Sequence, residues 1–406
     1  MQTRRDFVRT GAAAAGALSF GPTFWSEAFA APASVGDGPY GPLQPPDANG
    51  IMLPQGFSVR EIARGGQPVQ GTGYVWHIFS DGAATYRTPD GGWILVSNSE
   101  VPTPVEIPGP GLGDLGDGGA SAIRFRPDGA IEDAYRILSG TSTNCAGGAT
   151  PWGTWLSCEE IEDGLVWECD PVGEREAVPH PALGAFEHEA VCVDPGRGHL
   201  YLTEDNGSGC LYRFKPKRKG DLSEGRLSVA RVGKRGFVEW IPVPDPSAKS
   251  APTREQVPGA TRFKRGEGIW FDSGFVYLVT TGDSKIRAYD TRRKKLTPVY
   301  DPKRLADPPL QDVDNVTVAP SGDLFVCEDP GGADGIDIGL ITPKPRREVS
   351  RFLKIRGAMH GDPESGDVSS EATGVIFDPS GTRMYFASQR AYAVGAVYEV
   401  TGPFRG

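Results

Sequence analysis

The chain has 406 residues, of which 42 are basic and 52 acidic, so its formal net charge is −10. Its hydrophobic content of 38% excludes a transmembrane bundle, and its 55 glycines and 36 prolines are typical of many short strands joined by tight turns. The acidic balance argues against nucleic acid as the main partner, because phosphate backbones require a basic surface, but it leaves small anionic substrates open.

The start of the chain has the pattern of an export signal. A pair of arginines precedes the small, apolar stretch 10–20, and an Ala-x-Ala cleavage site ends at Ala30. This order predicts a twin-arginine signal peptide over 1–30 and a single domain over 31–406. The apolar stretch is too short and too rich in alanine and glycine for a stable membrane anchor. We therefore expect the twin-arginine machinery to export the folded protein to the periplasm or the extracellular space.

One pattern recurs along the rest of the chain: a short apolar strand, a turn with proline or aspartate plus glycine, and a second strand with a polar end. Six units across 31–406 leave about 60 residues each, which suits the four-stranded blades of a β-propeller. We therefore predict an all-β, six-bladed β-propeller with a central metal-binding channel. A β-sandwich is the competing interpretation, but it gives no reason for six like units. The units contain the segments 89–98, 145–160, 189–205, 267–281, 314–329 and 374–388.

In different units, counting back six residues from the turn proline leads to the same structural position. Equivalent positions form a ring in a propeller, so we expect these side chains to converge on one end of the channel. The alternative is that the acids only solvate turns and strand ends, which requires no agreement in position. In the last unit the position falls on Thr373, and Glu371 lies two residues earlier. In four other units it holds Cys145, Glu189, Glu267 and Asp314.

The second strands of the units end in further oxygen ligands. Neighbouring residues on a strand face opposite sides, so only one of each pair points inward unless a bulge intervenes. So many carboxylates in one place would repel one another strongly, so we predict that several cations neutralise them. The pairs are Asn98 and Glu100, Glu159 and Glu160, Glu204 and Asp205, and Glu328 and Asp329.

The ligand types limit the metal. The chain has only 5 histidines and no HExxH motif, which disfavours a histidine-rich zinc site. Carboxylates with one thiolate suit calcium together with a harder, higher-valent transition ion. For Cys145, a half-cystine or a buried structural thiol is the alternative. Arg265, two residues before Glu267, is expected either to clamp a phosphate or carboxylate or to shield the acids in a salt bridge.

Several of these segments, in this order, resemble the PhoX-type alkaline phosphatase family. The resemblance covers most of 31–406, and its most specific block is Cys-Ala-Gly-Gly-x-Thr-Pro-Trp-Gly-Thr-Trp-Leu-x-Cys-Glu-Glu at 145–160. Members are six-bladed propellers with a central cluster of ferric and calcium ions, and they hydrolyse phosphomonoesters outside the cytoplasm. The other matching segments are 186–190, 201–205, 265–268, 314–315 and 327–329.

The resemblance implies roles for individual residues. Cys145 would be the thiolate ligand of iron, and Arg265 would hold the phosphate with help from Asn98. Two departures concern the pocket walls more than the metals: the chain looks shorter between blades than full-length members, and Ser99 stands where many relatives have a histidine. The implied carboxylate ligands are Glu160, Glu189 and Glu267 for iron, and Glu159, Asp314, Glu328 and Asp329 for calcium.

The sequence therefore predicts an exported phosphomonoesterase that depends on iron and calcium and acts on a small phosphate ester. Two other functions stay open. One is a secreted propeller without catalytic activity, whose ions are structural and whose open face binds a partner. The other is a calcium-dependent lactonase or phosphodiesterase, which would work without Cys145.

Overall fold

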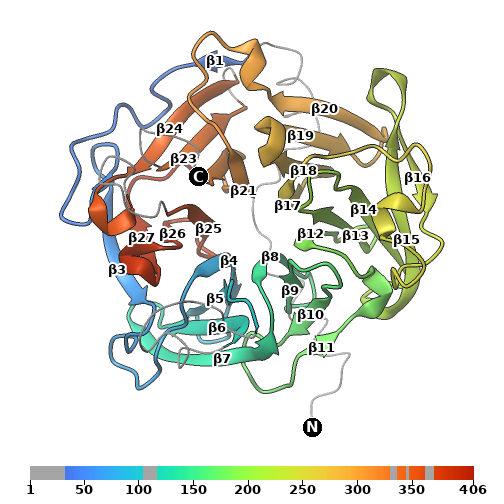
Figure 1. The fold of residues 1–406 in the computed structure, drawn as a ribbon. Coiled ribbons are helices and arrows are strands. Elements are labelled where there is room, and N and C mark those ends of the chain that lie inside the picture. The colour runs from blue at the N-terminus through green and yellow to red at the C-terminus, as the bar shows by residue number, and fades with distance from the viewer. Residues whose placement is uncertain (1–32, 104–116, 330–335, 344–346, 362–369) are drawn as a thin grey trace.

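The chain forms a ring of six sheets around a central axis, as Figure 1 shows. This confirms the predicted all-β, six-bladed β-propeller. The predicted signal peptide, 1–30, lies outside the described residues. The computed structural model describes residues 33–103, 117–329, 336–343, 347–361 and 370–406.

Each sheet is one blade, and its strands follow one another from the axis outward. The first blade consists of β4 (Ser80–Arg87), β5 (Trp93–Ser99), β6 (Gly118–Phe125) and β7 (Ile131–Thr141). The second consists of β8 (Asn144–Ala149), β9 (Trp155–Glu159), β10 (Val166–Cys169) and β11 (Val178–Pro179). The third consists of β12 (His188–Asp194), β13 (His199–Glu204), β14 (Leu211–Arg218), β15 (Asp221–Val232) and β16 (Val238–Pro242).

The remaining blades follow the same order. The fourth consists of β17 (Gly266–Asp272), β18 (Phe275–Thr280), β19 (Lys285–Asp290) and β20 (Lys295–Tyr300). The fifth consists of β21 (Val313–Val318), β22 (Leu324–Glu328), β23 (Ile336–Thr342) and β24 (Glu348–Ile355), with β1 (Ser34–Val35) and β2 (Ile51–Met52) at its edge. The sixth consists of β25 (Ala372–Phe377), β26 (Arg383–Ser388), β27 (Ala396–Thr401) and β3 (Ser58–Arg64).

Helical structure among the described residues is limited to single 3-10 turns in the connections. None of these helices is long and apolar enough to cross a lipid bilayer. The turns are Pro181–Leu183, Lys234–Gly236, Thr253–Glu255, Thr281–Asp283, Pro302–Arg304, Ala358–His360 and Ala391–Ala393.

The sixth blade closes the ring by combining both ends of the described chain. Its three inner strands come from the C-terminal end, and its outermost strand, β3, comes from the N-terminal end and pairs with β27. An ion pair between Arg60 Nε and Glu399 Oε1, at 2.7 Å, joins the two strands. Closure of this kind protects strand edges that would otherwise be open for pairing with another chain.

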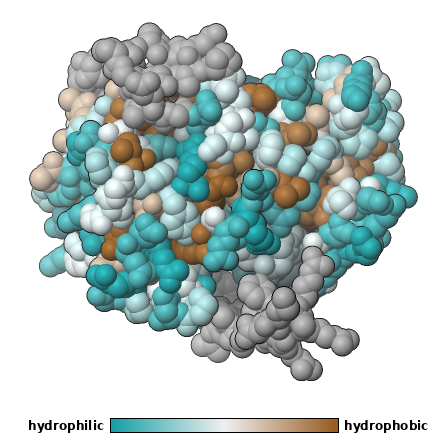
Figure 2. Space-filling view, turned by 90° about the horizontal axis from the view of Figure 1, so that it is seen from below, coloured by the Kyte–Doolittle hydropathy of each residue, from teal (hydrophilic) through white to brown (hydrophobic). Residues whose placement is uncertain are grey.

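Neighbouring blades pack face to face, so the middle strands are buried on both sides. All residues of β5 and β22 are buried, for example. Strands buried in this way have nearly continuous apolar sequences instead of a strict alternation. Between the first and sixth blades, the indole of Trp93 donates to the hydroxyl of Tyr385 at 3.0 Å, and the rings of Phe125 and Tyr385 lie 5.6 Å apart. On the outer side seen in Figure 2, hydrophobic residues appear as separate groups between hydrophilic ones.

The innermost strand of every blade contains a β-bulge at the same place. In β12, for example, the register with β13 shifts between His188 and Val191, which leaves Glu189 and Ala190 as the extra residues. Corresponding shifts occur in β4, β8, β17, β21 and β25. A bulge re-aims side chains, and here it brings one residue of each blade to the same end of the hub. These residues are Asp81, Cys145, Glu189, Glu267, Asp314 and Gly374.

The bulge register corrects the position predicted for the last unit. Gly374, not Thr373, stands where the other units have a ligand type, because the strand from bulge to turn is one residue shorter in this blade. Thr373 stays paired with Ala387, and its hydroxyl donates to the carbonyl oxygen of Ser80 at 2.8 Å.

Candidate metal centre

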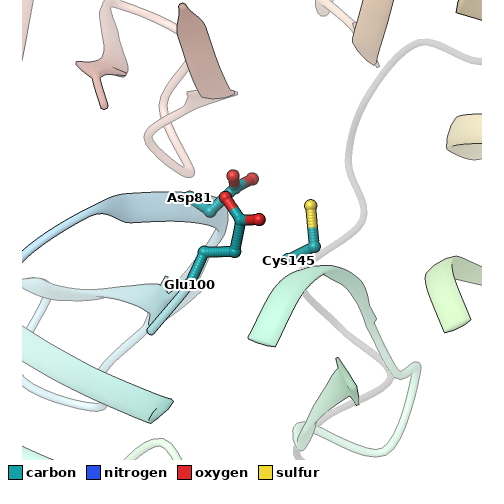
Figure 3. A group of neighbouring side chains, drawn as sticks. All are labelled: Asp81, Glu100 and Cys145. Carbon is teal, nitrogen blue, oxygen red and sulfur yellow. The ribbon is translucent and has the colours of Figure 1, made fainter. Parts of the chain in front are cut away.

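Five of the six bulge residues form a nearly continuous chain of ligand atoms around the hub. The structure brings them together with Glu100 and Glu160 in three overlapping groups, in each of which the ligand atoms lie within 4.8 Å of one another. Figure 3 shows the carboxylates of Asp81 and Glu100, from the first blade, pointing toward the thiol of Cys145 in the next blade. The groups are Asp81, Glu100 and Cys145; Cys145, Glu160 and Glu189; and Glu189, Glu267 and Asp314.

Small residues after the bulge allow the inner strands to approach closely. A Cβ atom on Gly82 would lie 2.5 Å from the Cα atom of Ala146, and one on Gly268 would lie 2.7 Å from the Cα atom of Asn315. Both distances are shorter than real Cβ contacts, so only glycine fits there. The Asp-Gly and Glu-Gly pairs therefore combine a ligand with the space that the neighbouring blade needs.

The paired acids at the ends of the second strands divide as the alternation of a strand requires. Glu160 points into the hub, whereas Glu159 accepts hydrogen bonds from Ser142 N at 3.1 Å, Leu165 N at 3.2 Å and Trp167 Nε1 at 2.9 Å. Glu159 therefore connects its strand end to neighbouring loops and lies outside the three groups. Its predicted place in the calcium shell stays a prediction.

Glu328 occupies the same place in the fifth blade. Its carboxylate accepts hydrogen bonds from Gln311 N at 2.7 Å and Asp337 N at 3.0 Å, so it too is used within its own blade. Glu328 lies outside the three groups, and its predicted place in the calcium shell stays a prediction. Its neighbour Asp329 instead faces the rim of the hub, where it is 3.2 Å from Arg265.

Asn98 is completely buried and holds the Cys145 bulge in place. Its amide nitrogen donates to the carbonyl oxygens of Cys145 at 3.1 Å and Ala146 at 2.7 Å. Its amide oxygen accepts from Trp155 Nε1 at 2.8 Å and Ser157 Oγ at 3.0 Å. An amide offers two donors and two acceptor sites, so nothing remains for a phosphate. Asn98 is a positioning residue, which corrects its predicted help in binding phosphate.

Arg265 lies at the rim of the hub, with 40% of its side chain exposed. Its Nε and Nη2 atoms donate to Asp205, and its Nη1 atom donates to Asp329 at 3.2 Å. Nη2 is also 3.2 Å from a carboxylate oxygen of Glu267. Burial opposes the charge of Arg265, but the hydrogen bond to Asp205 and the charge of Glu267 outweigh it and raise its pKa. Arg265 therefore shields the acids and at the same time faces the opening.

Three further residues belong to this site, although the sequence pattern does not predict a role for them. Asp81 lies in the first blade, and Gln389 donates from its amide nitrogen to Asp81 at 2.6 Å and to Glu100 at 2.5 Å. Arg390 donates to Glu371 at 2.6 Å. Asp81 has one recognisable signal, since the acid is followed by glycine as in the Glu267-Gly268 pair. Gln389 and Arg390 follow the second strand of the last unit. Neither is an acid, so the pattern of paired carboxylates does not include them.

The centre concentrates buried negative charge that its own hydrogen bonds do not neutralise. Burial first, and then the charges of the neighbouring acids, raises the pKa values of the ring carboxyls and of the Cys145 thiol well above their ordinary values. Burying unpaired carboxylates is costly, so this arrangement calls for cations. In the centre, four buried residues have oxygen atoms without a hydrogen-bond partner among the described residues: Asp81, Glu189, Glu267 and Gln389.

The donor set also limits which cations fit. Carboxylate and amide oxygens suit calcium, and a thiolate between two carboxylates suits a transition ion such as iron. None of the cysteines, all of which lie among the described residues, forms a disulfide, so Cys145 is not a half-cystine. The residues present therefore fit a mixed cluster of the kind that the sequence predicts.

The fold and the site together define a six-bladed propeller with an acidic, thiol-containing hub suited to several cations. The family model for the alkaline phosphatase PhoX matches residues 87–301, and the chain belongs to this family. No curated protein sequence matches the chain.

Solved structures share the fold. Pseudomonas fluorescens PhoX in complex with vanadate, a transition state analogue, is similar with a TM-score of 0.71 and 17% identity, over 89% of this chain and 97% of that chain. A Bacteroides thetaiotaomicron protein of unknown function is similar with a TM-score of 0.52 and 11% identity, over 85% of this chain and 76% of that chain. At these identities the similarity shows the fold alone.

Proposed function

We propose that this alkaline-phosphatase-like protein hydrolyses small phosphomonoesters with iron and calcium ions held by the hub. The observation that carries the proposal is the cluster of acids around Cys145, in which Asp81, Glu189 and Glu267 have buried oxygens without a hydrogen-bond partner among the described residues, with a partly exposed arginine at its rim. The complex of the similar Pseudomonas fluorescens PhoX with vanadate supports phosphoryl chemistry at such a hub.

The three groups suggest how the ions would be distributed. Cys145, Glu160 and Glu189 would hold iron, because this group contains the thiolate. The all-oxygen group of Glu189, Glu267 and Asp314 continues the ring, with Glu189 shared between the two. When bound, the cations withdraw charge from phosphate oxygens and lower the pKa of water.

Arg265 would bind the phosphate with the part of its guanidinium that the acids leave open. Of its five N–H groups, hydrogen bonds to Asp205 and Asp329 engage the one on Nε and one on each terminal nitrogen. One N–H on Nη1 and one on Nη2 remain, and this pair has the fork geometry that fits two phosphate oxygens. Nη2 also lies 3.2 Å from Glu267 Oε1, so a bound phosphate would compete with that ion pair for the fork. The ion pairs with Asp205 and Asp329 fix the plane of the fork before the substrate arrives, which reduces the entropy lost on binding.

Export remains part of the proposal. The paired arginines Arg4 and Arg5 and the cleavage site ending at Ala30 support a twin-arginine signal over 1–30 and a periplasmic or extracellular location. The mass of the protein recovered from its own export pathway checks cleavage after Ala30. An intact N-terminus would contradict it.

The test combines elemental analysis with hydrolysis of p-nitrophenyl phosphate. The native protein is expected to contain iron and calcium and to release p-nitrophenol. Cys145→Ala should lose iron and reduce turnover at least about a hundredfold, as expected when a ligand of a catalytic metal is removed. Cys158→Ala is the matched control, because Cys158 is a thiol of the same blade that lies outside the three groups, so this variant should keep both metals.

Other outcomes identify the other functions. Metal-dependent melting without hydrolysis of any ester would favour a binding protein with structural ions. Ester or lactone hydrolysis that survives Cys145→Ala would favour a calcium-only enzyme. Zinc as the only metal would contradict the proposed centre.

A further inference from the structure

Two hairpins at the outer edges of the third and fourth blades form a surface that we call the basic patch. The turn between β15 and β16 and the turn between β19 and β20 touch each other: Val238 N donates to the carbonyl oxygen of Lys294 at 2.8 Å, and Phe237 pairs with Lys295 in an isolated β-bridge. The basic residues of the patch, all exposed, are Arg231, Lys234, Arg235, Arg292, Arg293, Lys294 and Lys295.

The charge of the basic patch is opposite to that of the chain. Its seven basic side chains are accompanied by only two acids, Asp290 and Glu239, so the patch has a net charge of +5 in a chain of net charge −10. Of these seven cations, only Arg231 and Arg293 have ion-pair partners among the described residues, namely Glu239 at 2.7 Å and Asp290 at 3.7 Å. The other cations repel one another without stabilising the fold, so their concentration indicates an anionic partner.

Phe237 adds an exposed aromatic ring to these cations. It is 55% exposed, the largest fraction of any large hydrophobic side chain in the described part of the chain. The turn that presents it is tight, because Arg235 and Gly236 both have positive φ angles, of 62° and 84°. An aromatic ring beside lysines and arginines is the composition that binds the interface of an anionic bilayer, where the ring enters the headgroup region and the cations pair with phosphates.

In the fourth blade, the register places the turn between β19 and β20 at the edge of the sheet away from the metal centre. In this blade, Asp272, Phe275, Asp290 and Lys295 follow one another along one edge of the sheet, whereas Gly266, next to Glu267, pairs with Thr280 at the other edge. In the third blade, by contrast, the turn between β15 and β16 lies at the same edge as His188, because Glu204, Leu211 and Val229 follow one another along that edge. The patch therefore extends along the outer rim of the two blades.

We propose that the basic patch docks the protein reversibly on a membrane surface that contains anionic phospholipids. The cations supply the attraction to lipid phosphates, and Phe237 supplies a contact that salt does not screen. Double-stranded nucleic acid is the other polyanion that a cationic surface attracts, but its bases are stacked inside the helix and offer no apolar layer for a single protruding ring. The proposal is independent of the proposed catalytic activity, because none of its residues lies in the metal centre.

The test is cosedimentation of the metal-loaded full chain with phosphatidylcholine vesicles, with and without phosphatidylglycerol. Binding should require phosphatidylglycerol and weaken in high salt. The triple variant Arg235→Gln, Lys294→Gln and Lys295→Gln should lower the partition coefficient about a hundredfold, because each cation near an anionic surface contributes roughly fivefold. The triple variant Arg126→Gln, Lys249→Gln and Lys303→Gln is the control, since it removes the same charge from exposed positions elsewhere and should bind like the native chain.

Phe237→Ser distinguishes a bilayer from a dissolved polyanion. It should weaken vesicle binding several-fold at both low and high salt and leave binding to double-stranded DNA unchanged, because duplex bases are stacked on one another and cannot stack on the ring. Equal losses in the two triple variants, or equal binding to vesicles with and without phosphatidylglycerol, would overturn the proposal. Binding to DNA but not to vesicles would overturn it in favour of a nucleic-acid surface. Melting temperatures of all variants should match that of the native chain, because every substituted side chain is exposed.

Discussion

The polar side chains around Cys145 fall into two kinds. Those of Asp81, Glu189 and Glu267 contain buried oxygens without hydrogen-bond partners, whereas Asn98 uses its whole amide to hold the backbone of the Cys145 bulge. The first kind is prepared for cations, and the second keeps the ligands at fixed positions. Sequence alone does not separate them, because an asparagine beside a cluster of acids suits either role.

Replacing Asn98 should therefore affect folding and metal content rather than substrate binding. Asn98→Ala leaves the carbonyl oxygen of Ala146 and the indole of Trp155 without buried partners, and it should lower the free energy of unfolding by about 2–4 kcal/mol. Denaturant unfolding and iron analysis measure both effects. An increased KM for p-nitrophenyl phosphate with unchanged stability would instead assign Asn98 to the substrate.

At the level of the strand, the six bulges explain which ligands the sequence could predict. Counting from the turn proline reaches Cys145, Glu189 and Asp314 because bulge and turn are separated by the same number of residues in their blades. The first blade has a longer strand after its bulge and the last has a shorter one, so the same count misses Asp81 and falls on Thr373 instead of Gly374. Strand period and turn signals predict the fold, but the position of a bulge depends on how neighbouring blades meet.

The bulge of the first blade depends on the absence of a side chain at Gly82. Gly82→Ala would place a Cβ atom 2.5 Å from the backbone of Ala146, so the first two blades must separate at the Cys145 bulge. We expect a loss of about 1–3 kcal/mol in stability, together with loss of iron. Gly73→Ala is the matched control, because a Cβ atom there has no neighbour within 4 Å. Its melting temperature should stay close to that of the native protein. Equal melting of the two variants would contradict the close approach of the blades.

At the level of the whole molecule, the hub brings together acids from all parts of the ring. Only one acid of each pair reaches it, Glu160 but not Glu159 for example, and this division follows from strand alternation. Which member points inward depends on the register of each sheet, which the sequence pattern leaves open. The repulsion among the inward acids, in contrast, is predictable from their number and makes the stability of the whole ring dependent on bound cations.

Removal of the cations should therefore change how stability depends on pH. In the metal-free protein, burial and the charge of Glu100 raise the pKa of Glu371 to about 8, above its ordinary value of 4.5, and the ring acids shift in the same direction. Between these two values the folded chain binds more protons than the unfolded chain, so stability falls as the pH rises. The chelated protein should melt at a lower temperature at pH 8 than at pH 5, and reloading with iron and calcium should remove most of this dependence. A melting temperature of the chelated protein that stays constant or rises over this range would show that the acids are neutralised without cations.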